Sequence, residues 1–231
     1  GDVARMLSEG ALALSAVETV VGTSGTDTVT MLAAGTLAAS EVETLLGSAA
    51  AETVTLLGSS ADVAVSQINT VIGTTGSDSV SMLGADTTAV SNVETVLGTT
   101  DGAEVVRLVG AGIVGVSNVD TVLGGSGSDA LRMLGAGDVS ASSVETAIGS
   151  AGTDTLTLVG AGTVSVSAIE SIVGSTTSVE VVRLIQPGFT FSVSSIDTVI
   201  GTESNLDRIA LLGATDVAVS GVETVIGSSD A

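Results

Sequence analysis

The 231-residue chain contains no histidine, cysteine, lysine, tyrosine or tryptophan, and only one proline. Without cysteine no disulfide framework can form, although export remains compatible with this composition. The side chains that most often act as general acids, bases or nucleophiles are missing, apart from carboxylates. Carboxylate pairs alone can hydrolyse glycosides, but the acids of this chain recur in uniform columns and form no single distinct pair. We therefore expect a protein that is not an enzyme.

Positive charge is also scarce, because five arginines face 26 acidic residues and the net charge is −21. Such a surface repels nucleic acids and anionic membranes and attracts divalent cations. No apolar run approaches the roughly 20 residues that a membrane span needs. With 44% hydrophobic residues the chain can still bury a core. These features predict no nucleic-acid partner and no membrane insertion.

What the chain does contain is a repeat of 25 to 27 residues that closes on a glycine. The closing glycines are Gly22, Gly47, Gly73, Gly98, Gly124, Gly149, Gly174, Gly201 and Gly227. Each unit has three strand-like pieces, such as 154–159, 163–167 and 169–173, in which apolar and small polar residues alternate. Alternation with period two is typical of half-buried strands.

A unit of this kind cannot bury its apolar side alone, so it must stack on its neighbours. The pattern predicts an all-β fold, a three-sided parallel β-solenoid of about nine coils. The repeat runs without a break, and neither end departs from it. We therefore expect residues 1–231 to form a single continuous domain without caps.

One turn carries a specific motif, which is GGSGSDALR from Gly124 to Arg132. It matches G-G-x-G-x-D-x-U-x, and looser copies begin at Gly22, Gly73 and Gly149. The glycines should let the backbone curl so that its carbonyl groups face the acid. These turns resemble the calcium-binding repeats of RTX proteins.

The RTX resemblance implies Ca²⁺ held between stacked successive turns. The adjacent turns with complete glycines are those of Asp129 and Asp154, which makes this pair the first candidate site. The candidate metal-site residues are Asp129, Asp154, Gly125, Gly127 and Gly152, followed by Asp27 and Asp78. Segments such as VET followed by GxxGxD turns also resemble bacterial surface-layer and adhesin-like proteins. That resemblance implies an extracellular or cell-surface location.

Two acidic columns emerge when the units are aligned. The first, the turn acids, comprises Asp2, Asp27, Glu52, Asp78, Glu104, Asp129, Asp154, Glu180 and Asp207. The second comprises Glu18, Glu43, Asn69, Glu94, Asp120, Glu145, Glu170, Asp197 and Glu223, in which only Asn69 is neutral. Five arginines are too few to neutralise both. Calcium is the expected partner of the first column, and the second is either a solvated face or a further cation site.

The third strand of every unit has two consecutive apolar residues after its Thr or Ser, for example Val96 and Leu97. Both cannot point inward on a straight strand. Either one of the columns turns a corner, or it forms an exposed apolar stripe that marks an interaction surface.

We therefore expect an extracellular structural protein that self-assembles or belongs to a longer scaffold. The end of the chain continues into its start in phase with the repeat, which predicts head-to-tail contacts through Gly1, Asp2, Ser228 and Ala231, or an excerpt of a longer solenoid. An alternative function is ice binding or surface adhesion through outward pairs such as Thr28 and Thr30. Interruptions such as Val105 and Arg107 weigh against a continuous threonine array.

Overall fold

The computed structural model describes residues 1–48, 50–100, 102–204, 206–213 and 216–228. All regular elements among these residues are β-strands. The chain divides into two units, Gly1–Asp120 (unit 1) and Thr121–Ala231 (unit 2). One continuous domain over residues 1–231 stays a prediction.

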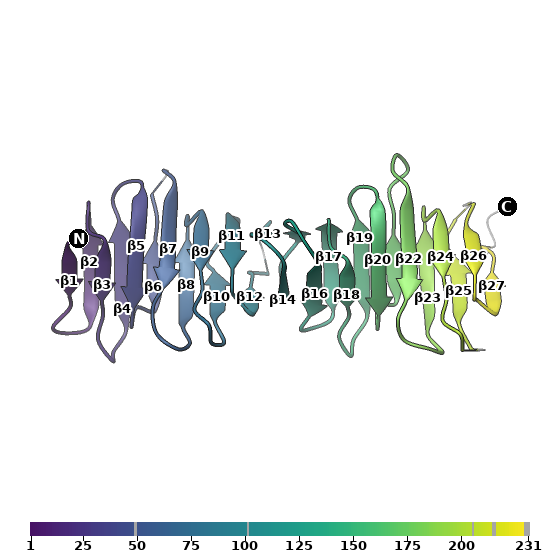
Figure 1. Ribbon diagram of the computed structural model, residues 1–231, viewed down its shortest axis with the longest axis horizontal. Coiled ribbons are helices and arrows are strands. Elements are labelled where there is room, and N and C mark those ends of the chain that lie inside the picture. Colours follow the sequence, from purple (N-terminus) through teal and green to yellow (C-terminus); the bar gives the residue numbers. More distant parts are fainter. Residues whose placement is uncertain (49, 101, 205, 214–215, 229–231) are drawn as a thin grey trace. The chain divides into compact units, whose positions relative to one another are not determined.

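The described residues of unit 1 form fourteen strands in two parallel sheets (Figure 1). The odd-numbered strands form one sheet in the order β1-β3-β5-β7-β9-β11-β13, and the even-numbered strands form the other from β2 to β14. The strands are β1 (Val3–Arg5), β2 (Gly10–Leu14), β3 (Thr19–Val21), β4 (Asp27–Met31), β5 (Gly35–Ser40), β6 (Thr44–Leu46), β7 (Glu52–Leu56), β8 (Asp62–Ser66), β9 (Thr70–Ile72), β10 (Ser79–Met82), β11 (Thr87–Ser91), β12 (Thr95–Leu97), β13 (Val105–Leu108) and β14 (Gly112–Ser117).

Unit 2 repeats this arrangement, with thirteen strands in the part that the structure describes. Its odd-numbered strands run in the order β15 to β27, and its even-numbered strands run from β16 to β26. The strands are β15 (Thr121–Leu123), β16 (Asp129–Met133), β17 (Gly137–Ser142), β18 (Thr146–Ile148), β19 (Asp154–Leu158), β20 (Gly162–Ser167), β21 (Ser171–Val173), β22 (Glu180–Leu184), β23 (Thr190–Ser194), β24 (Thr198–Ile200), β25 (Arg208–Leu211), β26 (Ala218–Ser220) and β27 (Thr224–Ile226).

The structure confirms the predicted all-β parallel solenoid but corrects its cross-section. Each turn has two strands rather than three, because consecutive strands belong to opposite sheets. Stacked residues are typically 16 to 19 positions apart, as in the pairs of Thr53 with Thr70 and Thr19 with Ala38. One repeat of three strands therefore makes one and a half turns. The prediction of three sides and about nine coils was wrong because the sequence shows where strands end but not how sharply each corner turns.

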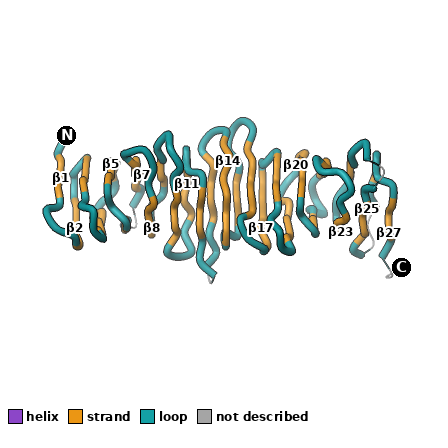
Figure 2. Tube along the Cα trace, turned by 90° about the horizontal axis from the view of Figure 1, so that it is seen from below, coloured by secondary structure: helices purple, strands orange, loops and turns teal. Residues whose placement is uncertain are grey.

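The half-turn offset places equivalent residues of successive repeats in opposite sheets. Asp129 begins β16 in the even sheet, whereas Asp154 begins β19 in the odd sheet. Because the strands of each sheet are parallel, the chain crosses along one sheet and returns along the other. Strands of the two sheets therefore start at opposite edges, and Figure 2 shows the connecting loops along both edges.

The core lies between the two sheets. Strand residues alternate between buried and partly exposed positions, as in β7 and β19. Val54 and Leu156 are completely buried, and so are their counterparts in most turns. Each such side chain contributes about 1.5–3 kcal/mol to folding through its removal from water.

One corner of each repeat is built on a left-handed backbone conformation. The non-glycine residues at this corner have φ between 51° and 56°, and they are Ala16, Glu41, Gln67, Asn92, Asn118, Ser143, Ala168 and Ser195. Gly221 occupies the equivalent position in the last repeat, with φ of 64°. The carbonyl of this corner residue packs against a closing glycine, since a Cβ on Gly149 would lie 1.6 Å from the Ala168 oxygen. A corner carbonyl meets Gly22, Gly47, Gly73, Gly98, Gly124, Gly174 and Gly201 in the same way, which explains why these closing positions are glycine.

The left-handed corner predicts a stabilising substitution. Ala168→Gly should raise the free energy of unfolding by about 0.5–1 kcal/mol, because the left-handed conformation penalises a Cβ more than the flexibility of glycine costs. Urea denaturation of the variant measures the change. Asn118→Gly is the control and should gain less, since asparagine tolerates this conformation better than alanine. A loss of stability in Ala168→Gly would contradict the expectation.

The two apolar residues of the third strand take opposite orientations. Val96 and Val122 are completely buried, whereas Leu97 is 36% exposed. The strand is straight, so the first column belongs to the core and the second faces outward. Because successive third strands belong to opposite sheets, these outward residues divide between two faces: Val21, Ile72, Leu123, Val173 and Ile226 lie on odd-numbered strands, and Leu46, Leu97, Ile148 and Ile200 lie on even-numbered strands. Of the two alternatives raised by the sequence, the structure thus favours the exposed stripe.

Candidate functional site

All turn acids except Asp2 are buried, and backbone amides point at the buried aspartates. Asp27 is 0% exposed, and its carboxylate accepts hydrogen bonds from the Gly10 N–H (3.0 Å) and from the Thr23 N–H and hydroxyl. Asp154 does the same with the Gly137 N–H (3.2 Å) and with Ser150. The curled turns therefore direct N–H groups at the acid, where the sequence predicted carbonyl groups. A nest of N–H donors stabilises an anion, and here the anion is the carboxylate itself.

These hydrogen bonds shift the acidity of the buried carboxylates. The Thr23 N–H is the main reason that the pKa of Asp27 lies below its ordinary value, and desolvation opposes it. At Asp207 burial acts to raise the pKa, but the hydroxyl and N–H of Thr202 and the Gly188 N–H outweigh it, so the pKa is lowered. Both groups favour the ionised form in the folded protein.

The two acidic columns meet in space. Each second-column side chain accepts a hydrogen bond from the backbone N–H of a turn acid one solenoid turn earlier, as in Asp27 to Glu43 and Asp129 to Glu145, both 2.7 Å. Asn69 does the same for the Glu52 N–H at 2.9 Å. The side chains of the second column therefore supply the hydrogen-bond acceptor for the backbone N–H at the start of a strand. Sequence analysis missed this role, although the constant spacing of 16 or 17 residues between paired acids was a visible signal.

The predicted calcium residues lie apart from one another. Asp129 and Asp154 are 1% and 0% exposed and begin strands at opposite edges, so the prediction that their turns stack directly was wrong. Gly125 donates its N–H to Asp129 at 2.7 Å, Gly127 has φ of 110°, and a Cβ on Gly152 would clash with Ala136. Asp78 is buried and bonded to Thr74 and to the Ala61 N–H. These glycines therefore serve turn geometry, and calcium binding stays a prediction.

The described residues contain no group of three or more acidic side chains placed to hold a metal ion. The residues predicted to meet at the chain ends also have contacts within the chain. The Asp2 N–H bonds to Glu18 at 2.6 Å, and the Ser228 hydroxyl bonds to the Gly213 oxygen at 3.1 Å, while Gly1 lies close to Glu18. Ala231 lies outside the described residues.

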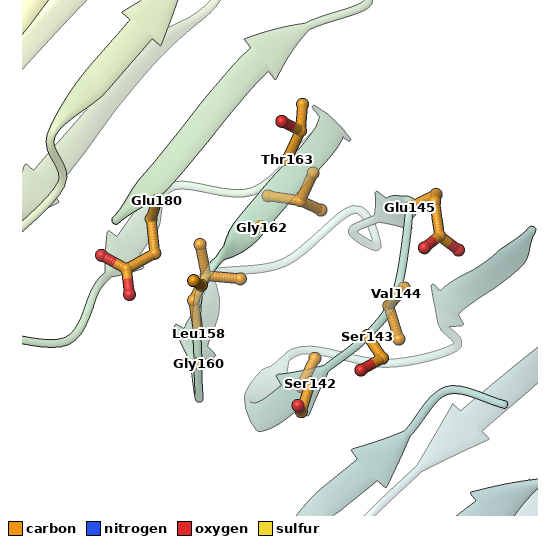
Figure 3. Close-up of a pocket in the computed structure, with 12 residues that line it drawn as sticks. Ser142, Ser143, Val144, Glu145, Leu158, Gly160, Gly162, Thr163 and Glu180 are labelled. Atoms are coloured by element: carbon orange, nitrogen blue, oxygen red, sulfur yellow. The ribbon is translucent and has the colours of Figure 1, made fainter. Parts of the chain in front are cut away.

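A shallow groove recurs beside the left-handed corner. In unit 2 it has a volume of about 200 Å³ and runs between the corner of Ser143 and the loop of Gly160 (Figure 3). Glu145 and Glu180 lie on opposite sides of it. Unit 1 has equivalent grooves of about 120 and 250 Å³. The walls of these grooves consist of aliphatic side chains, glycines and hydroxyl groups, with one or two carboxylates. These lining residues do not place a nucleophile beside a general base.

The outer faces of the sheets carry short side chains and the arginines. Thr36, Thr53 and Thr70 stack in register on the odd sheet of unit 1, and Ala89 and Arg107 continue the same row. All five arginines are exposed. Among the outward positions of this sheet that the structure describes, the charged residues are arginines. The acidic residues of the sheet lie inward or at the corners.

Comparisons of the chain with protein-family models, curated proteins and solved structures give no match. Within the described part of the chain, no helix is long and apolar enough to cross a membrane. Function therefore has to be argued from the surfaces and the buried acids.

Proposed function

We propose that the chain is a non-enzymatic structural protein, a β-solenoid scaffold at the cell surface or outside the cell that associates with further copies of itself. The observation that carries this proposal is an apolar stripe near the strand ends of each sheet. Leu57 and Val109 follow strands of the odd sheet and are 40% and 52% exposed, and Leu83 follows a strand of the even sheet and is 50% exposed. They lie diagonally beside the outward column of the third strands, for example Leu57 beside Ile72.

The charge distribution supports contact between copies. A net charge of −21 would oppose association if it were spread evenly, but eight of the nine turn acids are buried and all five arginines lie exposed. A stripe that repeats along the solenoid matches another surface with the same period, and a second copy provides one. Patches of this kind on soluble proteins are typical of interaction sites.

The test is the association state of variants in the stripe. Leu83→Glu and Leu97→Glu should reduce or abolish concentration-dependent association in sedimentation velocity while the melting temperature changes little, since both side chains are at least one-third exposed. Ser79→Glu, at an outward position of β10 that pairs with Thr95 rather than with a stripe residue, is the matched control and should weaken association less. A wild-type chain that stays monomeric at high concentration would overturn the proposal, and so would variants that associate like wild type.

The same proposal includes calcium binding, but through other carboxylates than the turn acids that the sequence predicted. Burial of the turn acids favours the exposed second-column carboxylates, such as Glu94 and Asp120, as the groups that meet the ion. Extracellular calcium modules bind with Kd of about 10⁻⁴–10⁻³ M. Millimolar calcium should therefore raise the melting temperature. Isothermal titration without calcium uptake would remove this part and leave the scaffold untouched.

Ice binding or surface adhesion is the second candidate function. The row of Thr36, Thr53 and Thr70 favours it, because hydroxyl and methyl groups then repeat at the strand spacing of about 4.8 Å on a flat face. A thermal-hysteresis assay decides this candidate, with Thr53→Leu as the variant that should lose any activity.

A further inference from the structure

The two sheets of unit 1 carry charges of opposite sign on their outer faces. Because the core lies between the sheets, these faces point in opposite directions. At the outward positions of the odd-numbered strands that the structure describes, the charged residues are Arg5 and Arg107. At the described outward positions of the even-numbered strands, the charged residue is Asp62 in β8. The odd face of unit 1 is therefore positive and its even face is negative.

The acceptor residues that precede the third strands add to this difference. Glu43 and Glu94 directly precede β6 and β12 of the even sheet. In the odd sheet Glu18 precedes β3, but the residue before β9 is Asn69. The neutral member of the second acidic column therefore lies in the sheet that carries the two arginines, and the even sheet has the larger number of carboxylates at its strand starts.

The charged groups on the two faces have no partners within the part of the chain that the structure describes. Arg5 and Arg107 are exposed, and neither guanidinium group makes an ion pair or a hydrogen bond with a described residue. The same holds for the exposed carboxylate of Asp62. An arginine can hold a carboxylate through two parallel hydrogen bonds, which adds geometric specificity to the contact. These groups are therefore available to a partner.

We propose that unit 1 binds a second copy of the chain face to face, with the odd sheet of one copy on the even sheet of the next. This inference rests on the proposed association between copies and specifies its geometry. Both faces contribute stripe residues, such as Leu57 on the odd sheet and Leu83 on the even sheet. Pairing two odd faces would place arginines opposite arginines, and pairing two even faces would place acids opposite acids. Like charges across an interface disfavour a contact, so the pairing of opposite faces is selected.

Short side chains allow the two faces to approach closely. Thr53 stacks on Thr70 in the odd sheet, and Thr28 stacks on Thr44 in the even sheet. Sheets that pack face to face lie about 10 Å apart, and the strands of both faces repeat at about 4.8 Å. The strands of one copy therefore match the strands of the next in period, which is a property that a second copy of this chain supplies.

A contact between unlike faces does not close. Each copy that uses its odd face for one neighbour keeps its even face free for another, as in other heterologous interfaces that form open assemblies. Copies of unit 1 should therefore add one after another across the sheets, and a dimer is only the first step.

Single cysteines test the contact, because the chain has no cysteine of its own. Thr53→Cys marks the odd face and Thr44→Cys marks the even face. With a bismaleimide that spans about 10 Å, a mixture of the two variants should give at least several-fold more cross-linked dimer than either variant alone. Isotope labelling of one variant identifies mixed dimers by mass. Ser60→Cys, in an exposed loop, is the control and should give little product in either mixture.

The charge contribution is tested on the same cross-link. Adding Arg107→Glu to the Thr53→Cys copy should lower the yield of mixed dimer several-fold, and high salt should lower the yield without this change. Arg208→Glu makes the same change at an exposed arginine of unit 2 and is the matched control, so it should lower the yield less. Circular dichroism should show that both variants stay folded.

Three results would overturn the pairing of unlike faces. The first is that each variant alone forms as much cross-linked dimer as the mixture, which would indicate contacts between like faces. The second is that no cysteine on either face cross-links although the wild-type chain associates, which would place the contact elsewhere. The third is that Arg107→Glu changes the yield no more than Arg208→Glu does. In all three cases association through the stripe remains, whereas a monomeric wild-type chain would remove both proposals.

Discussion

Val96→Glu is expected to prevent unit 1 from folding, whereas Leu97→Glu, one residue later in β12, should leave it folded. Val96 is completely buried between the sheets, and an unpaired carboxylate there should cost more than about 4 kcal/mol, a large part of the stability of a typical domain. Leu97 is 36% exposed, so its replacement keeps the new charge in water. Circular dichroism and urea denaturation of the two variants measure the difference.

The result also tests the assignment of the outward column. If Leu97→Glu unfolded the protein as severely as Val96→Glu, the second apolar residue would belong to the core and the stripe would not exist. Val122→Glu, at the equivalent buried position of β15, should behave like Val96→Glu. The pair at residues 96 and 97 is a matched control, since both changes add the same charge to the same strand.

The second large effect is expected at a turn acid. Asp154→Ala should lower the free energy of unfolding by about 2–4 kcal/mol, because it leaves the Gly137 and Ser150 N–H groups, which point at this buried position, without an acceptor. Urea denaturation in the presence of a chelator gives the relevant value. Asp138→Ala is the control, since Asp138 lies exposed in β17 and its loss should cost less than about 0.5 kcal/mol.

Asp154→Asn separates the structural role of this acid from calcium binding. The amide can accept from one N–H group, but its own NH₂ then faces other donors, so this variant should also be destabilised without calcium. A role mainly as a calcium ligand predicts the reverse, which is unchanged stability in chelator and a lost response to calcium. That outcome would show that the N–H nest contributes little.

Much of the candidate site could be read from aligned repeats, but its partners could not. The alignment placed Asp154 in a column of turn acids and Glu170 in a second acidic column. The structure shows that Glu170 accepts the Asp154 N–H at 2.9 Å, in the next turn of the solenoid. Alignment compares residues about 25 positions apart, whereas stacking joins residues 16 to 19 apart, so the sequence columns are not the columns in space.

The sequence by itself determined the strands, the inward and outward positions of the first two strands of each repeat, and the parallel solenoid. These follow from local rules, because alternation with period two, glycine corners and an unbroken repeat leave few other ways to bury the apolar face. Only the tertiary structure decided that each turn has two strands, and therefore that Asp129 and Asp154 lie at opposite edges while Glu180 lies beside Asp197. The angle of a corner depends on how it packs on the next turn, as where the Ala168 carbonyl meets Gly149, and no single repeat contains that contact.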